Sequence, residues 1–82
     1  MAETRFITDF SRAPKLHIGA RLKHFKGAEY EVISYMHDDD CIQIIFNDIA
    51  EPQSVPLFAP ILEFEKEVLL DGRWTPRFKN LH

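Results

Sequence analysis

Residues 29–47 read EYEVISYMHDDDCIQIIFN, and this stretch decides the fold. The segment Cys41 to Asn47 is rich in β-branched and aromatic residues, which is typical of a central strand. The segment Glu29 to His37 alternates imperfectly between polar and apolar residues, as a strand with one buried face does. The three aspartates between them, residues 38–40, favour a reverse turn because aspartate side chains bond their own backbone. The stretch therefore predicts two strands joined by a charged hairpin tip.

Downstream, a second hairpin is predicted around Asp71-Gly72, a two-residue turn that favours the primed geometry matching the twist of paired strands. Its strands are expected over residues 65–70 and 73–78. Pro56 lacks a ladder donor, so the short strand at residues 55–59 belongs at a sheet edge or a bulge. Residues 60–64 favour a single helical turn, because proline is well suited to the start of one.

Upstream, residues 21–25 predict a first short strand that is followed by a turn at residues 26–28. Turn signals spaced about eight to twelve residues apart are typical of a small all-β barrel, here with five to six antiparallel strands over residues 18–80. Within residues 1–17, the run 8–14 shows neither strand alternation nor a sustained helical stripe. We expect an N-terminal arm that packs, through Phe6 and Phe10, on the barrel or on a second subunit.

Composition narrows the class of protein. A chain of 82 residues accommodates one domain, and its lone cysteine, Cys41, has no internal disulfide partner. No apolar run has the length of a membrane span, and the N-terminal residues lack the pattern of a secretory signal, so a cytoplasmic location is expected. The net charge of −3 is unevenly distributed: residues 1–27 carry +4, residues 28–71 carry −10 and residues 72–82 carry +3.

Short motifs occur in a fixed order between Ile18 and Phe78. They are Gly19, Lys23-His24-Phe25-Lys26-Gly27, Tyr30-Glu31-Val32, His37, Ile44-Ile45-Phe46, Pro60, Phe64, Glu67-Val68, Asp71-Gly72 and Pro76-Arg77-Phe78. In this order and spacing the chain resembles the bacterial domain-of-unknown-function family 1653. The resemblance implies an SH3-like barrel and no established activity.

The chain departs from that family at polar positions. The family usually has His-Ser-Glu-Thr where this chain has residues 37–40, and Trp-Val-Arg-Pro where it has residues 57–60. Asn47 replaces an arginine that is common in the family. If the family's polar residues line a ligand site, this chain either takes a different ligand or is a divergent copy.

Cations and aromatic rings gather near both ends of the predicted barrel. They are Arg21, Lys23, His24, Phe25 and Lys26 at one end and Arg73, Trp74, Arg77, Phe78 and Lys79 at the other. If the first and last strands are neighbours, these residues suit a phosphate-bearing or nucleotide-like ligand, or single-stranded nucleic acid. We favour the competing interpretation, in which Trp74 and Phe78 are core residues and the arginines pair with Glu65, Glu67 or Asp71. A pI near 5.7 also weighs against nucleic acid.

Six residues are the candidate ligand-binding set: His24, Lys26, His37, Arg73, Trp74 and Arg77. For His24 two interpretations stay open. A histidine in a strand is usually a satisfied structural residue, but the lysine and the turn amides that follow it suit an anion.

The sequence contains no clear pattern of a catalytic or metal-binding site. Residues 37–41 include metal-ligand types, but the paired spacing of a structural zinc site is absent. Cys41, which a nearby His24 or His37 would have to activate, begins an apolar strand, where a free cysteine usually packs as a small hydrophobe. We expect no catalytic residue, no metal and no cofactor.

We therefore expect a small non-catalytic binding module for a protein or small ligand. Two alternatives are kept: binding of a nucleotide or single-stranded nucleic acid through the basic ends and, as the least favoured, an enzyme of unknown reaction. A homodimer is an expected assembly, and a membrane is not an expected partner.

Overall fold

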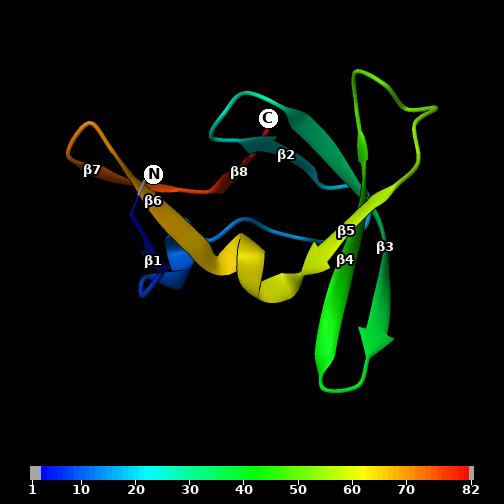
Figure 1. Cartoon of the computed structure of the whole chain (residues 1–82), viewed down its shortest axis with the longest axis horizontal. Helices are drawn as coiled ribbons and strands as arrows, with labels where there is room; N and C mark the ends of the chain where they lie inside the picture. Colours follow the sequence, from blue (N-terminus) through cyan, green and yellow to red (C-terminus); the bar gives the residue numbers. More distant parts are fainter. Residues whose placement is uncertain (1–2, 82) are drawn as a thin grey trace.

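A computed structural model describes residues 3–81, which form eight β-strands and two 3-10 helices (Figure 1). The predicted all-β class is confirmed. More strands form than the five or six expected, because three-residue strands appear in the N-terminal arm and after the last hairpin. The elements are β1 (Thr4–Phe6), η1 (Phe10–Arg12), β2 (Arg21–His24), β3 (Glu29–Asp38), β4 (Cys41–Asp48), β5 (Leu57–Pro60), η2 (Ile61–Glu65), β6 (Lys66–Leu70), β7 (Arg73–Pro76) and β8 (Phe78–Asn80).

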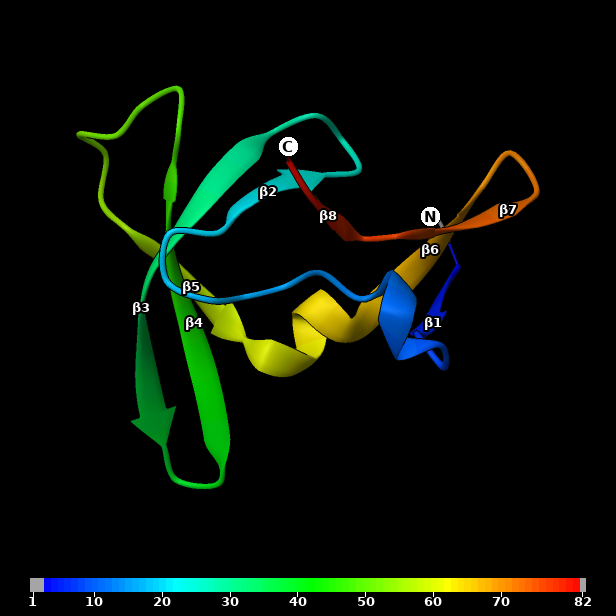
Figure 2. The same ribbon diagram turned by 180° about the vertical axis from the view of Figure 1, so that it is seen from behind.

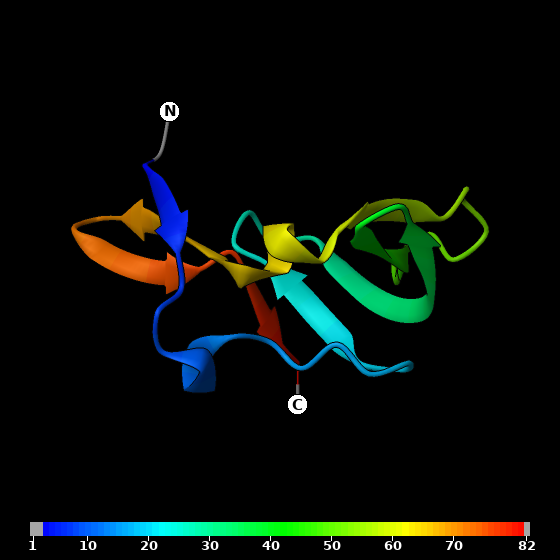
Figure 3. The same ribbon diagram turned by 90° about the horizontal axis from the view of Figure 1, so that it is seen from below.

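The strands form two antiparallel sheets that lie side by side along the long axis (Figures 1 and 3). One has the order β5-β4-β3-β2-β8 and the other β1-β6-β7. The chain passes between them at Arg77, whose N–H donates to the carbonyl of Lys66 and whose carbonyl accepts from Phe25 N–H, both at 3.0 Å. The SH3-like form of a barrel stays a prediction.

The two long strands, β3 and β4, project as a hairpin beyond the rest of the molecule (Figure 1). Their turn follows the predicted aspartates: Asp38 is the Cα partner of Cys41, and Asp39 has a φ of 50°. The projection helps to explain a radius of gyration of 12.7 Å, slightly above the roughly 12 Å typical of a compact domain of this length. Strand β5 lies at the sheet edge, as Pro56 just before it predicts.

The main core lies between one face of the five-stranded sheet and helix η2. Its members are at most 6% exposed: Ala20, Leu22, Val32, Ile44, Phe46, Phe64 and Phe78. Phe64, supplied by η2, is 0% exposed, and its ring centroid lies 4.5 Å from that of Phe78 and 5.7 Å from that of Phe46. Residues distant in sequence therefore meet at this aromatic ring.

The N-terminal segment is part of the folded domain. Strand β1 pairs with β6, and after η1 the chain runs across the side of the molecule that faces the viewer in Figure 2 to reach β2. Ile7, 5% exposed, anchors the segment, whereas Phe6 and Phe10 are 53% and 75% exposed. The two phenylalanines thus do not bury themselves on this domain, and their contact with a second subunit stays a prediction.

Candidate functional site

Strands β2 and β8 bring the two basic ends of the chain together. They pair antiparallel, with Leu22 opposite Asn80, Lys23 opposite Lys79 and His24 opposite Phe78. The condition on which a shared basic face depends, that the first and last barrel strands be neighbours, is therefore met.

Two adjoining depressions lie over this pairing and the neighbouring strand β7. The first, about 240 Å³, is lined by Lys23, His24, Phe25, Leu70, Thr75, Pro76 and Lys79. The second, about 440 Å³, is lined by Arg12, Arg73, Trp74, Thr75, Pro76 and Lys79. Three residues, Thr75, Pro76 and Lys79, line both, so the two depressions adjoin. Together they are here called the basic groove, and no carboxylate is among the lining residues.

The cations of the groove include an unusual pair. Lys23 and Lys79 are direct cross-strand partners, and both are exposed. Like charges placed directly opposite each other destabilise a sheet. Among residues 3–81 neither lysine forms a salt bridge, and Arg73 forms none either. On its other side Lys23 is the direct partner of Glu29 on β3, and Arg12 forms an ion pair with Glu67. Lys79 and Arg73 carry positive charge that no salt bridge among the described residues balances, and an anion would neutralise it.

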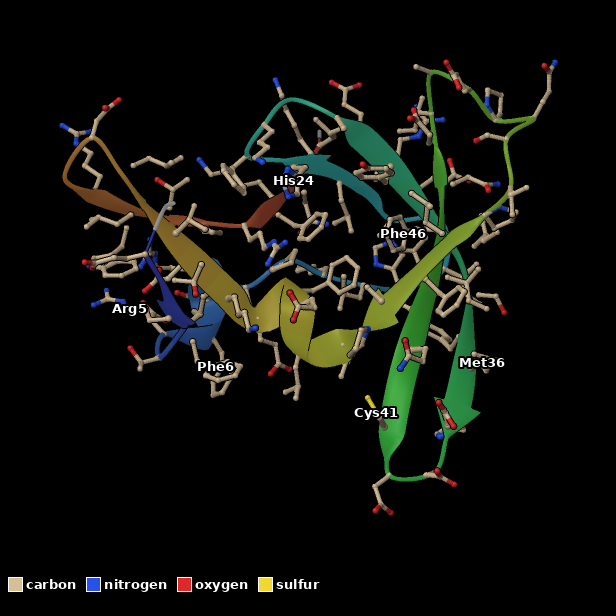
Figure 4. All side chains as sticks on the ribbon, in the orientation of Figure 1. Arg5, Phe6, His24, Met36, Cys41 and Phe46 are labelled. Carbon is tan, nitrogen blue, oxygen red and sulfur yellow. The ribbon has the colours of Figure 1, made fainter. Side chains whose placement is uncertain are left out.

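His24 lies at the β2 end of the groove (Figure 4). Its ring centroid lies 4.4 Å from that of Phe25 and 5.0 Å from that of Phe78. Burial of the ring, reinforced by the positive charges of Arg77 and Lys26, lowers the pKa of His24. Nδ1 accepts a hydrogen bond from the Lys26 N–H at 3.2 Å, so the neutral ring carries its proton on Nε2 and keeps one donor.

Trp74 lies at the other end of the groove. The guanidinium carbon of Arg5 is 4.0 Å from its ring centroid and covers one face of the ring. The backbone carbonyl of Trp74 accepts a 2.6 Å hydrogen bond from Arg12 Nη2. The indole is therefore held in place by the N-terminal segment and lines the groove on its remaining surface.

Arg77 has a structural environment. Its Nη1 lies 2.8 Å from Glu63 Oε2 in a part-buried ion pair, and it does not line the groove. The sequence predicts Glu65, Glu67 or Asp71 as the partner, whereas the observed partner is Glu63 of η2. Lys26, another residue of the predicted ligand set, is exposed in the turn after β2 and does not line the groove.

His37 lies away from the groove, on the projecting hairpin. Figure 4 shows its neighbour Met36, and Cys41 on the facing strand, at the end of the molecule remote from His24. His37 pairs with Ile42 while Cys41 pairs with Asp38, so the two side chains point to opposite faces of the hairpin. Within residues 3–81 no three His, Cys, Asp or Glu side chains gather in a way that would hold a metal ion.

Three cations of the groove are not in the ligand set predicted from the sequence: Arg12, Lys23 and Lys79. The pairing of β2 with β8 is the signal that selects the two lysines. Arg12 carries no such signal, because it reaches the groove only through the path of the N-terminal segment.

No family model, curated protein or solved structure matches this chain. The resemblance to family 1653 therefore stays a prediction. In the part of the chain that the structure describes, no helix combines the length and apolar character needed to cross a membrane.

Proposed function

We propose that this protein is a small non-catalytic module that binds an anionic ligand in the basic groove. The observation that carries the proposal is the placement of Lys23 opposite Lys79 in a groove that no carboxylate lines, with neither lysine in a salt bridge among residues 3–81. Such a pair costs stability in the free protein, and a bound anion would turn the repulsion into two charge-assisted hydrogen bonds.

The other donors in the groove suit the same role. Thr75 and the His24 ring offer neutral hydrogen-bond donors, and Arg73 offers a fork of N–H groups that fits phosphate or carboxylate oxygens. Leu70, Phe25 and Pro76 supply apolar surface between the charges. A few polar groups on an apolar lining are typical of ligand sites.

A binding role is favoured over catalysis by the positions of the reactive side chains. A nucleophile needs its base within hydrogen-bond reach. The only cysteine, Cys41, lies on the projecting hairpin while His24 lies in the groove (Figure 4), and the nearer His37 points to the opposite face. We therefore keep the enzyme as the least favoured alternative, and the homodimer and the cytoplasmic location as predictions.

An NMR titration with inorganic pyrophosphate tests the proposal. We expect saturable chemical-shift changes at the backbone amides of Lys23, His24 and Lys79. The Lys23→Gln substitution should lower the affinity for pyrophosphate at least about tenfold, since a hydrogen bond to a charged group contributes roughly 1.5–3 kcal/mol. Lys15→Gln is the matched control, because Lys15 is an exposed lysine outside the groove. Shifts spread evenly over all basic residues, or equal losses in the two variants, would contradict a dedicated site.

A further inference from the structure

We infer that the ligand of the basic groove is a single-stranded nucleic acid, an inference that rests on the anion-binding function proposed above. The first support is that cations line both of the adjoining depressions that make up the groove. Lys23 lines one depression, Arg12 and Arg73 line the other, and Lys79 lines both. One phosphate would engage only part of this track, whereas a chain of phosphates can follow it.

The second support is the placement of aromatic rings along the same track. Phe25 lines the depression that contains Lys23, and Trp74 lines the one that contains Arg73. Each depression therefore combines a cation with a flat ring. This combination is typical of sites that hold unpaired bases, because a cation holds the phosphate while the ring stacks on the base.

The rings are also held in fixed orientations. Arg5 covers one face of the Trp74 indole at 4.0 Å, and His24 packs on Phe25 with ring centroids 4.4 Å apart. A stacking surface that is ordered before binding loses less conformational entropy when a base arrives. Only an unpaired base can stack in this way, so a single strand is favoured over a duplex.

The acidic residues of the chain lie outside the lining of the groove. No carboxylate lines the groove, and Glu29 is opposite one groove lysine, Lys23. Three of the acidic residues, Asp38, Asp39 and Asp40, are at the tip of the projecting hairpin (Figure 1). The local field of a groove depends most on the charges nearest to it, because screening in physiological salt acts over about 8 Å.

Two fluorescence measurements on the intact protein test the inference. Trp74 is the only tryptophan of the chain, so stacking of a base on it should quench the intrinsic emission when oligothymidylate is added. Anisotropy of labelled oligothymidylate should give a log–log dependence of affinity on salt with a slope of roughly −2, as expected for contacts from Lys23, Lys79 and Arg73 to a single strand. The double variant Lys23→Gln, Lys79→Gln should bring the slope to roughly −0.7, and Lys15→Gln should leave it unchanged.

Stacking is tested separately from charge. Phe25→Leu should weaken oligothymidylate binding roughly tenfold while leaving the salt slope unchanged, because it removes a ring and no cation. Thermal unfolding of the variant checks that it folds. Oligouridylate added in parallel distinguishes RNA from DNA as the source of the strand, and binding of either supports the inference.

The outcomes separate this inference from the function on which it rests. Pyrophosphate shifts confined to the groove, together with no oligonucleotide binding at low salt, would overturn the nucleic-acid inference and leave anion binding standing. Equal affinity for a duplex and an oligonucleotide of the same sequence would also overturn it. Loss of both pyrophosphate and oligonucleotide binding would refute both proposals.

Discussion

Arg5 Nε lies 2.6 Å from Glu67 Oε1, and the two residues are direct cross-strand partners between β1 and β6. Arg12 Nη1 lies 2.7 Å from the other carboxylate oxygen, close enough for an ion pair but without the alignment of a hydrogen bond. The Glu67 side chain is 1% exposed, whereas those of Arg5 and Arg12 are 50% and 38% exposed. One buried carboxylate therefore ties both β1 and η1 to the central strand of the smaller sheet.

This unequal burial predicts unequal effects of substitution. Arg5→Met combined with Arg12→Met should lower the free energy of unfolding by about 3–5 kcal/mol, because the Glu67 charge is left buried without a partner. Glu67→Gln should cost less, because the half-exposed arginines regain water. Urea unfolding measures both differences. A larger loss in the glutamine variant than in the double arginine variant would contradict this account.

The aromatic core gives a second prediction. Phe64→Ala should lower the free energy of unfolding by about 3–5 kcal/mol, since the ring is fully buried between Phe46 and Phe78. A domain of this size has only about 5–15 kcal/mol in total, so the loss is large. Phe58→Ala is the matched control because that ring is 66% exposed. Similar effects of the two substitutions in chemical denaturation would show that Phe64 does not centre the core.

The local parts of the fold could be predicted from the sequence. The aspartate turn, the Asp71-Gly72 turn and the edge position of β5 depend on neighbouring residues, and each forms where residues 38–40, 71–72 and Pro56 indicate. Strand β1 was not predicted, because Thr4–Phe6 is short and is exposed throughout, so it lacks an alternating pattern. Its pairing depends on the distant β6.

The candidate site was predicted less well, because it too depends on pairing between strands that are distant in the sequence. The sequence places cations at both ends of the chain, but only the β2–β8 register shows that Lys23 meets Lys79. Arg77 belongs to the predicted ligand set because it lies among the cations and rings of the last predicted strand, residues 73–78. In the structure Glu63 of η2 is its partner, and no local pattern predicts that contact. Long-range pairings of this kind leave no local pattern in the chain.

The Asp71-Gly72 turn gives a third prediction. Both residues have positive φ, 49° and 77°, as the predicted primed turn requires. Gly72→Ala should lower the free energy of unfolding by about 1–2 kcal/mol for conformational reasons alone, because an added Cβ would meet nothing within 4 Å. Asp71→Asn should be nearly neutral or slightly stabilising, since asparagine tolerates this conformation well. Thermal unfolding of the two variants distinguishes backbone strain from a packing clash, and a neutral Gly72→Ala would show that the turn relaxes.

The lowered pKa of His24 makes stability depend on pH. Burial of the ring is the main cause, followed by the charges of Arg77 and Lys26. The unfolded chain, with a histidine pKa near 6.5, therefore binds a proton more readily than the folded one. The contribution of His24 to stability is complete above pH of about 6.5 and is lost as pH falls through the folded pKa. The His24→Phe variant keeps an aromatic ring against Phe25 and Phe78. As pH falls from about 6.5 through the folded pKa of His24, the unfolding free energy of this variant should fall less than that of the natural chain.

The same histidine links stability to the proposed ligand. An anion in the groove favours the imidazolium, so saturating pyrophosphate should raise the pKa of His24 toward its ordinary value. An NMR titration of the ring protons with and without pyrophosphate measures both values. A midpoint at or above 6.5 in the free protein would contradict the buried position of the ring, and an unchanged midpoint with pyrophosphate bound would place the anion away from His24.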